Sequence, residues 1–157
     1  MRAILLAAAA LAGLSSAALA AGDGDAFKYM TREQAFATVT KVDPEGNATS
    51  NPISNHADFQ EIIVQRTVSG KVETHENYSD YMMIVDGSGT LTVGGKVNEN
   101  KKNPNGQPGE WLGVSSSGGK VYDLKPGVLV IIPKGMPHWI QLPKGGKLQY
   151  MAFKRRG

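Results

Sequence analysis

Cysteine is absent from the 157 residues of this chain. That absence excludes a disulfide framework, a thiolate metal site and a cysteine nucleophile, so any bound metal ion must be held by nitrogen and oxygen atoms. A large excess of one charge is also lacking, because 17 Lys and Arg residues stand against 14 Asp and Glu residues, and the basic residues are scattered. The sequence does not indicate a basic patch for nucleic acid, and we expect no nucleic-acid partner.

Long apolar runs are missing too, since a transmembrane helix needs about 20 apolar residues in a row. At the N-terminus, Arg2 precedes a shorter apolar run over residues 3–13 and a small-x-small site at residues 18–20. This arrangement is typical of a secretory signal peptide. We therefore predict a signal peptide over residues 1–20, cleavage before Ala21, and a periplasmic or secreted protein that has no membrane contact after cleavage.

The length after cleavage is that of one domain. We assign residues 21–58 to an N-terminal lead and residues 59–157 to a barrel domain. Within the lead, Thr31 and Gln34 have the spacing of a capping box. This spacing predicts one short helix that ends near Ala37.

From residue 59 onward, β-branched and apolar runs are separated by Gly, Pro and Asn, a pattern typical of an antiparallel all-β domain. Short strands of this kind suit a jelly roll or a small barrel, which protects its strand edges by closure or sheet pairing. The predicted strands cover residues 59–68, 71–76, 81–85, 89–93, 120–124, 128–132, 138–141 and 148–154. The side chains expected in the core or in an apolar pocket wall are Met82, Ile84, Val128, Val130, Ile132, Ile140 and Leu142.

One insertion, residues 96–119, departs from this pattern. Residues 98–109 are polar and rich in Pro and Gly, and an apolar patch around Trp111 follows them. A long loop in a compact domain often forms a lid or a binding loop. The alternative is a solvent-exposed hairpin whose Trp111 only caps the barrel, and the sequence leaves both open.

The first group of candidate ligands lies between residues 73 and 80. Alternate residues of a strand face the same way, so Glu73 and His75 are predicted to project together. A turn over residues 76–79 would return Asp80 on the next strand. We therefore expect two carboxylates and one imidazole to converge.

A second segment supplies a fourth donor. In Gly127-x5-Pro133-x-Gly135-x2-His138, a buried run ends in a corner that places His138 at the start of another strand. Together with Glu73, His75 and Asp80, it would complete a set of two imidazoles and two carboxylates. Such a set suits one divalent ion of Fe, Mn, Ni or Zn, and a metal that prefers more ligands would keep room for water or substrate.

The two segments resemble the two motifs of the cupin family, G-x5-H-x-H-x3,4-E-x6-G and G-x5-P-x-G-x2-H-x3-N. His75 stands at the second histidine, Asp80 at the glutamate, and Gly87 follows at the family spacing, while residues 127–138 match the second motif. The resemblance covers roughly residues 59–153. It implies a cupin-type double-stranded β-helix, or jelly-roll barrel, in an exported bacterial form that holds one metal ion. As in many cupins, it also implies a homodimer joined at sheet edges.

The chain also departs from the family motifs. Glu73 replaces the first histidine, Asp80 replaces the glutamate, and Leu142 replaces the closing asparagine. Carboxylates remain good ligands for divalent cations, so the number of donors is kept while the ligand charge becomes more negative. The sequence does not determine the identity of the metal.

The resemblance implies a function as well. Small cupins include isomerising proteins, lyases and dioxygenases, so we expect a mononuclear metalloenzyme that acts on a small oxygen-rich organic substrate. Glu73 and Tyr78 are the candidates for proton transfer; Tyr81 is a second phenol expected near the pocket mouth, and aromatic packing is the alternative role for both tyrosines. Two other hypotheses remain: a non-catalytic module that binds a small ligand or the metal, and a structural barrel whose four donors form a metal-free polar cluster.

Overall fold

The computed structural model describes residues 27–42, 47–50 and 52–157, so the predicted signal peptide lies outside the described residues. The strands are β1 (Val39–Val42), β2 (Ala48–Ser50), β3 (Ser54–Asn55), β4 (Phe59–Arg66), β5 (Val72–His75), β6 (Tyr78–Gly87), β7 (Gly89–Val93), β8 (Lys96–Asn98), β9 (Lys101–Lys102), β10 (Glu110–Gly113), β11 (Ser115–Ser117), β12 (Lys120–Leu124), β13 (Leu129–Ile132), β14 (His138–Gln141) and β15 (Leu148–Arg156). Antiparallel pairing joins these strands throughout. The predicted all-β class is confirmed.

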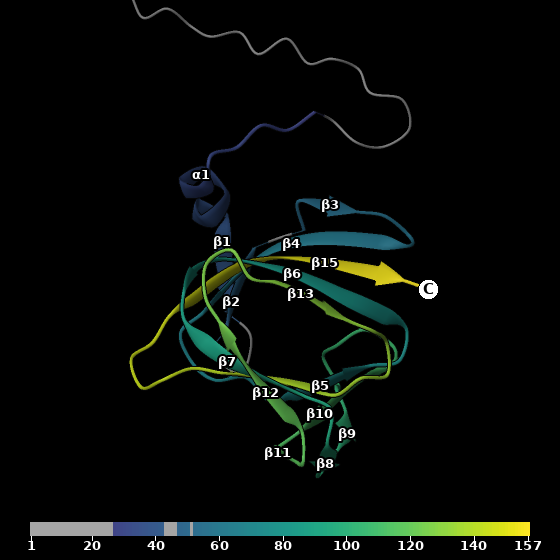
Figure 1. Ribbon diagram of the computed structural model, residues 1–157. Coiled ribbons are helices and arrows are strands. Elements are labelled where there is room, and N and C mark those ends of the chain that lie inside the picture. The colour runs from purple at the N-terminus through teal and green to yellow at the C-terminus, as the bar shows by residue number, and fades with distance from the viewer. Residues whose placement is uncertain (1–26, 43–46, 51) are drawn as a thin grey trace, which may run out of the picture.

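Two sheets face each other and form a barrel (Figure 1). One sheet has the order β1-β2-β4-β15-β6-β13, with β3 paired to β4, and the other has the order β12-β7-β14-β5-β10-β9. Strands β8 and β11 form a separate ribbon. This arrangement places β5 and β14 in one wall and β4, β6 and β15 in the other, so side chains from both walls can meet inside.

The core fills the space between the two sheets. Met82, Ile84, Ile132 and Ile140 are at most 4% exposed, and Val128, Val130 and Leu142 pack against them, so the predicted core residues are confirmed. Core residues that the sequence did not single out come from β4, β7, β12 and β15: Val64, Leu91, Leu124, Leu148, Tyr150 and Ala152.

Each predicted strand overlaps an observed one, and the largest difference is at β6. This strand begins at Tyr78 rather than at residue 81, because Glu76 and Asn77 alone turn the chain between β5 and β6. The tighter turn brings the whole of β6 next to β15, with which it pairs along its full length. The predicted turn over residues 76–79 is thus two residues shorter, and Asp80 lies on the next strand as expected.

The helix α1 (Arg32–Ala37) has the predicted capping box. The Thr31 hydroxyl accepts from the Gln34 N–H, and the Gln34 side chain accepts from the Thr31 N–H at 2.8 Å. The helix lies outside the barrel, beside β1 and β4 (Figure 1). Strands β1, β2 and β3 follow it and join the sheet at β4, so the predicted lead contributes to the barrel wall. Among the described residues, no helix combines the length and the apolar character needed to span a membrane.

Half of the insertion at residues 96–119 is strand. Strand β10 pairs with β5 on one side and with β9 on the other, so it extends the barrel wall. Trp111 belongs to β10, and its indole N–H donates to Glu76 Oε1 at 2.8 Å. Residues 103–109 form its longest loop, between β9 and β10, and the Asn77 side chain ties this loop to the β5–β6 turn through the Pro108 carbonyl.

Candidate metal centre

The predicted ligands of β5 and β14 lie opposite each other in one sheet. His138 of β14 is the direct cross-strand partner of Glu73 on β5, and His75 lies two residues further along the same face. Gly135 sets the corner before β14: its φ is 78°, a region that glycine adopts without strain, and its N–H donates to the His75 carbonyl at 2.7 Å. The corner therefore fixes the start of β14 against the end of β5.

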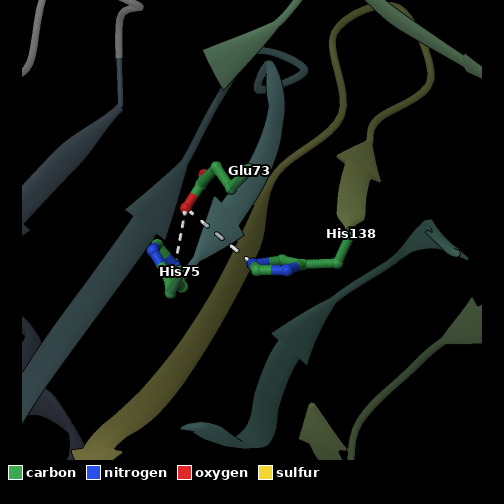
Figure 2. A group of neighbouring side chains, drawn as sticks. All are labelled: Glu73, His75 and His138. Atoms are coloured by element: carbon green, nitrogen blue, oxygen red, sulfur yellow. Dashed lines mark ion pairs between the residues drawn. The ribbon is translucent and has the colours of Figure 1, made fainter. Parts of the chain in front are cut away.

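Glu73, His75 and His138 point toward one another (Figure 2). Glu73 Oε2 lies 3.6 Å from His75 Nε2 and 4.0 Å from His138 Nε2. One potential ligand atom of each residue lies within 4.8 Å of the others. Asp80, from the opposite sheet, brings its Oδ2 to 3.1 Å from His75 Nε2 and 3.5 Å from His138 Nε2. All four predicted donor side chains are thus brought together.

The spacing of these atoms fits a metal ion. Neighbouring ligand atoms about 2.0–2.2 Å from a metal lie about 2.8–3.6 Å apart in octahedral or tetrahedral sites, a range that three of these four distances meet. Among the described residues, both ring nitrogens of His75 and Asp80 Oδ1 are buried without a hydrogen-bond partner, even though charged groups lie nearby. Buried polar atoms of this kind are rare in proteins and call for a ligand or an ion. The donor set therefore fits a divalent cation.

Neighbouring groups orient both imidazoles. His138 Nδ1 lies 3.1 Å from the Met136 carbonyl, which can only accept, so Nδ1 carries the proton and Nε2 is free to bind a cation. His75 Nδ1 faces Glu110 Oε1 at 3.6 Å. A carboxylate or carbonyl behind the distal nitrogen is the usual support for a metal-binding histidine.

Arg66 supports Glu73 from the opposite sheet. The buried guanidinium donates to Glu73 Oε1 at 2.8 Å, to Asn47 Oδ1 at 2.6 Å and, through Nε, to the Tyr150 hydroxyl at 3.0 Å. Because Arg66 takes Oε1, the other oxygen of Glu73 faces the imidazoles. Gly70 leaves room for this arrangement, since a Cβ there would lie 2.5 Å from the guanidinium.

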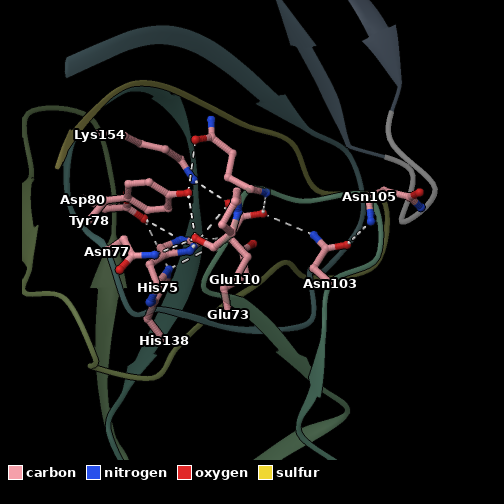
Figure 3. A network of polar contacts seen from close by, with 12 residues as sticks. Glu73, His75, Asn77, Tyr78, Asp80, Asn103, Asn105, Glu110, His138 and Lys154 are labelled. Atoms are coloured by element: carbon pink, nitrogen blue, oxygen red, sulfur yellow. Dashed lines mark hydrogen bonds and ion pairs between the residues drawn. The ribbon is translucent and has the colours of Figure 1, made fainter. Parts of the chain in front are cut away.

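Lys154 and Glu110 border the same cluster (Figure 3). Lys154 is the cross-strand partner of Asp80, and its Nζ lies 3.5 Å from Glu110 Oε1. Glu110 Oε2 accepts from the Gln107 N–H at 2.9 Å and from the Asn103 amide at 3.3 Å. Glu110 therefore links the loop at residues 103–109 to the back of His75.

The charges of the cluster shift several pKa values. Burial acts against the charged form of each group, but neighbouring charges outweigh it. His75 and Arg66 hold the pKa of Glu73 well below its usual range, and Lys154 and the imidazoles do the same for Asp80. Contacts with Asp80 and Glu73 raise the pKa of His75 to about 9, and the nearby carboxylates raise the pKa of Lys154. Without a metal, the cluster is thus held by opposite charges.

These side chains open onto a cavity of about 190 Å³. Its polar lining includes the four donors, Arg66, Glu110 and Lys154, with Lys71 and Asn103 among the further residues. Its apolar lining is formed by Ile62, Val64, Met82, Leu112, Ile140 and Ala152. The cavity is smaller than the roughly 300–1,000 Å³ pockets that hold drug-sized ligands. Only a small molecule fits.

Tyr78 lies at the cluster, but its hydroxyl is turned away from the cavity. Its ring packs against His75 edge-on, with 5.6 Å between centroids, while its hydroxyl lies 3.1 Å from Gln107 Oε1 and 3.3 Å from the Pro108 carbonyl. Tyr81 is on the opposite face of β6, where it does not line the cavity, so the expectation that it lies near the pocket mouth is wrong. The reason is the β6 alternation, which sends even-numbered residues inward.

Arg66, Glu110, Lys154 and Tyr150 were not found by reasoning from the sequence. None of the four belongs to a recognisable sequence motif. The pairing register would have revealed two of them, because Glu110 lies opposite His75 and Lys154 lies opposite Asp80. That register depends on strands far apart in the chain and cannot be inferred from the spacing of residues.

Neither a family model nor a curated protein matches this chain. Solved structures are similar to it. The polyketide cyclase RemF from Streptomyces resistomycificus is 14% identical with a TM-score of 0.55, over 81% of this chain and 80% of that one. KdgF from Halomonas sp. is 16% identical with a TM-score of 0.50, over 76% and 88%. A cupin 2 conserved barrel domain protein from Rhodopseudomonas palustris is 15% identical with a TM-score of 0.50, over 72% and 64%.

At these identities the similarity establishes the fold. The protein is a small cupin-type β-barrel, as the motif resemblance implied. Inside the barrel, Glu73, His75 and His138 form a group whose ligand atoms could hold a metal ion, and Asp80 lies beside both imidazoles.

Proposed function

We propose that the protein binds one divalent metal ion through Glu73, His75, Asp80 and His138 and acts as a mononuclear metalloenzyme on a small oxygen-rich organic molecule. The observation that carries this proposal is the meeting of two imidazole Nε2 atoms with carboxylate oxygens in a buried cavity. His75 supports it, because neither of its buried ring nitrogens has a hydrogen-bond partner among the described residues, and a bound cation would satisfy Nε2.

A metal ion in this site would polarise a substrate carbonyl or carboxylate and acidify bound water. The residues of the chain would do the rest. Arg66 fixes the orientation of Glu73, the apolar wall limits the entry of water, and Glu73 Oε2 lies where it can bind the ion or accept a proton. RemF is a polyketide cyclase, which supports an enzymatic use of this barrel on an organic molecule. The proposed reaction is of the isomerase, lyase or dioxygenase type.

A second candidate is a non-catalytic module that holds a small ligand or the metal. Two contacts favour it. Glu73 is engaged in an ion pair with Arg66, and the Tyr78 hydroxyl is directed to the loop at residues 103–109, so both predicted proton-transfer groups have other partners. Turnover assays on sugar acids, β-substituted carboxylates and catechols separate the two, since a module binds its ligand and returns it unchanged.

Metal analysis of matched histidine variants tests the metal proposal. The chain has three histidines, and His56 is an exposed one whose ring contacts Ser54, so it serves as the control. Purified protein should contain about one divalent ion per chain, His75→Ala and His138→Ala should lose it, and His56→Ala should keep it. Folded protein that takes up no divalent ion, or equal metal content in all three variants, contradicts the proposal.

We also propose that the protein is exported and acquires its metal outside the cytoplasm. Support comes from residues 1–20, which combine Arg2, an apolar run and a small-x-small site. Expression of the full chain in a bacterium, followed by fractionation and N-terminal sequencing, should give periplasmic protein that begins at Ala21. Uncleaved protein in the cytoplasmic fraction would contradict this proposal.

A further inference from the structure

We propose that the cavity binds a small organic monocarboxylate and that Lys154 holds its carboxylate group. The inference deepens the proposed function and rests on it, because the charge balance of the cavity includes the metal ion. Three features carry it: the spare donors of Lys154, the charge of the cluster, and the size and lining of the cavity.

Lys154 brings a partly buried ammonium group into the cavity. It comes from β15, directly opposite Asp80, and its side chain is 18% exposed. Among the described residues its ion pair is with Glu110, at 3.5 Å, longer than the roughly 2.7–2.9 Å of a strong charge-assisted hydrogen bond. An ammonium group has three N–H donors, so Lys154 keeps hydrogen-bonding capacity for a ligand.

Arg66, the other buried cation, is more fully engaged, because each of its three nitrogens already donates a hydrogen bond. Its Nε and both terminal nitrogens donate to Tyr150, Asn47 and Glu73, at 3.0, 2.6 and 2.8 Å. These bonds use three of the five N–H donors of the guanidinium and hold all three of its nitrogens in place. The two cations therefore have different roles: Arg66 orients Glu73, and Lys154 faces the space where a ligand would lie.

The charge of the cluster calls for an anion once a metal is bound. Glu73, Asp80 and Glu110 are three carboxylates against the two cations Arg66 and Lys154, which leaves one negative charge. Imidazoles are neutral when they bind a metal, so a divalent ion changes the balance to one positive charge. Lys71 also lines the cavity, but the residue is exposed, so solvent largely screens its charge. An unbalanced charge in a buried site is costly, and one carboxylate would neutralise it.

The cavity limits the rest of the ligand. A volume of about 190 Å³ admits a few carbon atoms, and the wall of Ile62, Val64, Met82, Leu112, Ile140 and Ala152 favours an apolar body next to the charged group. A phosphate ester would bring about two negative charges, whereas the metal-loaded cluster has one positive charge to balance. A neutral molecule would leave the positive charge unbalanced.

Calorimetric titration of the Mn(II)-loaded protein tests the inference with ligand pairs that differ mainly in charge. The pairs are acetate and acetamide, lactate and lactamide, and benzoate and benzamide. In the wild-type protein, at least one carboxylate should bind roughly tenfold or more tightly than its amide, the effect of one charge-assisted hydrogen bond. Lys154→Gln should lose this preference and Lys154→Arg should keep it. Lys102→Gln, which removes an exposed lysine of β9 outside the cavity, should also keep it.

The metal content of each sample distinguishes the outcomes. Lys154→Gln should keep its manganese, because losing a nearby cation removes a repulsion on the ion. If manganese is bound but no pair favours the carboxylate, the inference fails and the proposed function stands. If Lys154→Gln keeps the full preference, the metal alone holds the carboxylate and the inference is overturned. If the wild-type protein binds no manganese or other divalent ion, both fail.

Discussion

Replacement of Arg66 by methionine should destabilise the metal-free protein more than any exposed substitution. Arg66 is 6% exposed and its guanidinium makes three hydrogen bonds, one of them to the carboxylate of Glu73, whose side chain is 25% exposed. Removing one partner of a buried ion pair costs about 3–5 kcal/mol, because the other charge stays buried without compensation. A methionine side chain fills much of the space, so the loss reflects charge and hydrogen bonds more than an empty volume.

Metal should recover part of this loss. If Glu73 Oε2 binds a divalent ion, the ion supplies the positive charge that Arg66→Met removes. The free energy of unfolding should therefore rise more on addition of Mn(II) in Arg66→Met than in the wild-type protein. Urea unfolding in EDTA and in saturating Mn(II), followed by tryptophan fluorescence, measures both increments.

The control is Arg155→Met, which changes an exposed arginine on the same strand as Lys154. Its free energy of unfolding should stay within about 0.5 kcal/mol of the wild type. A loss under about 1 kcal/mol in Arg66→Met would refute the view that Arg66 compensates a buried charge. Equal gains from Mn(II) in Arg66→Met and wild type would refute Glu73 as a ligand.

Three further outcomes follow from the charges and contacts of the site. In metal-free protein, burial is outweighed by the nearby carboxylates, so the pKa of His75 is about 9, against 6.5 in the unfolded chain. The charged imidazole therefore adds about 3 kcal/mol to the free energy of unfolding below pH 6.5, and this contribution is lost as the pH rises through 9. Urea unfolding at pH 6 and pH 9.5 should show the loss, and His75→Gln should show a smaller change. Glu110→Gln should weaken Mn(II) binding about 10- to 100-fold in a chelator competition assay, because His75 loses the carboxylate behind Nδ1; unchanged affinity would remove Glu110 from the metal support. Tyr78→Phe should lower the free energy of unfolding by about 1 kcal/mol and leave the metal content intact, whereas loss of metal would show that the hydroxyl acts on the ligands rather than on the loop.

Much of the barrel could be predicted from the sequence because its central strands alternate. The runs around Ile84, Ile132 and Ile140 place apolar side chains on one face, and the structure buries each of them. The strands that the sequence did not predict are the short ones. Strands β1 to β3 and β8 to β11 have two to four residues each and lie in polar, Gly-, Pro- or Ser-rich sequence, where pairing with neighbours determines strand formation more than intrinsic preference does.

The donor cluster could be predicted because its members follow local rules. Glu73 and His75 share a strand face, and Asp80 and His138 come from short segments with recognisable spacing. The charges around them follow no such rule. Arg66 and Lys154 lie 88 residues apart in sequence, on the paired strands β4 and β15, and both line the cavity only because of the sheet register. The role of the insertion was open for the same reason, since β10 reveals its place only through pairing with β5.

The most direct test of the account is anomalous diffraction from crystals of the metal-loaded protein, recorded at the absorption edge of the bound metal. The account predicts one strong peak inside the barrel, about 2.0–2.3 Å from His75 Nε2 and His138 Nε2 and from oxygens of Glu73 and Asp80. A peak elsewhere on the surface, or no peak with His75 bonded to the carboxylates alone, would show that the cluster is a metal-free polar core and would contradict the account.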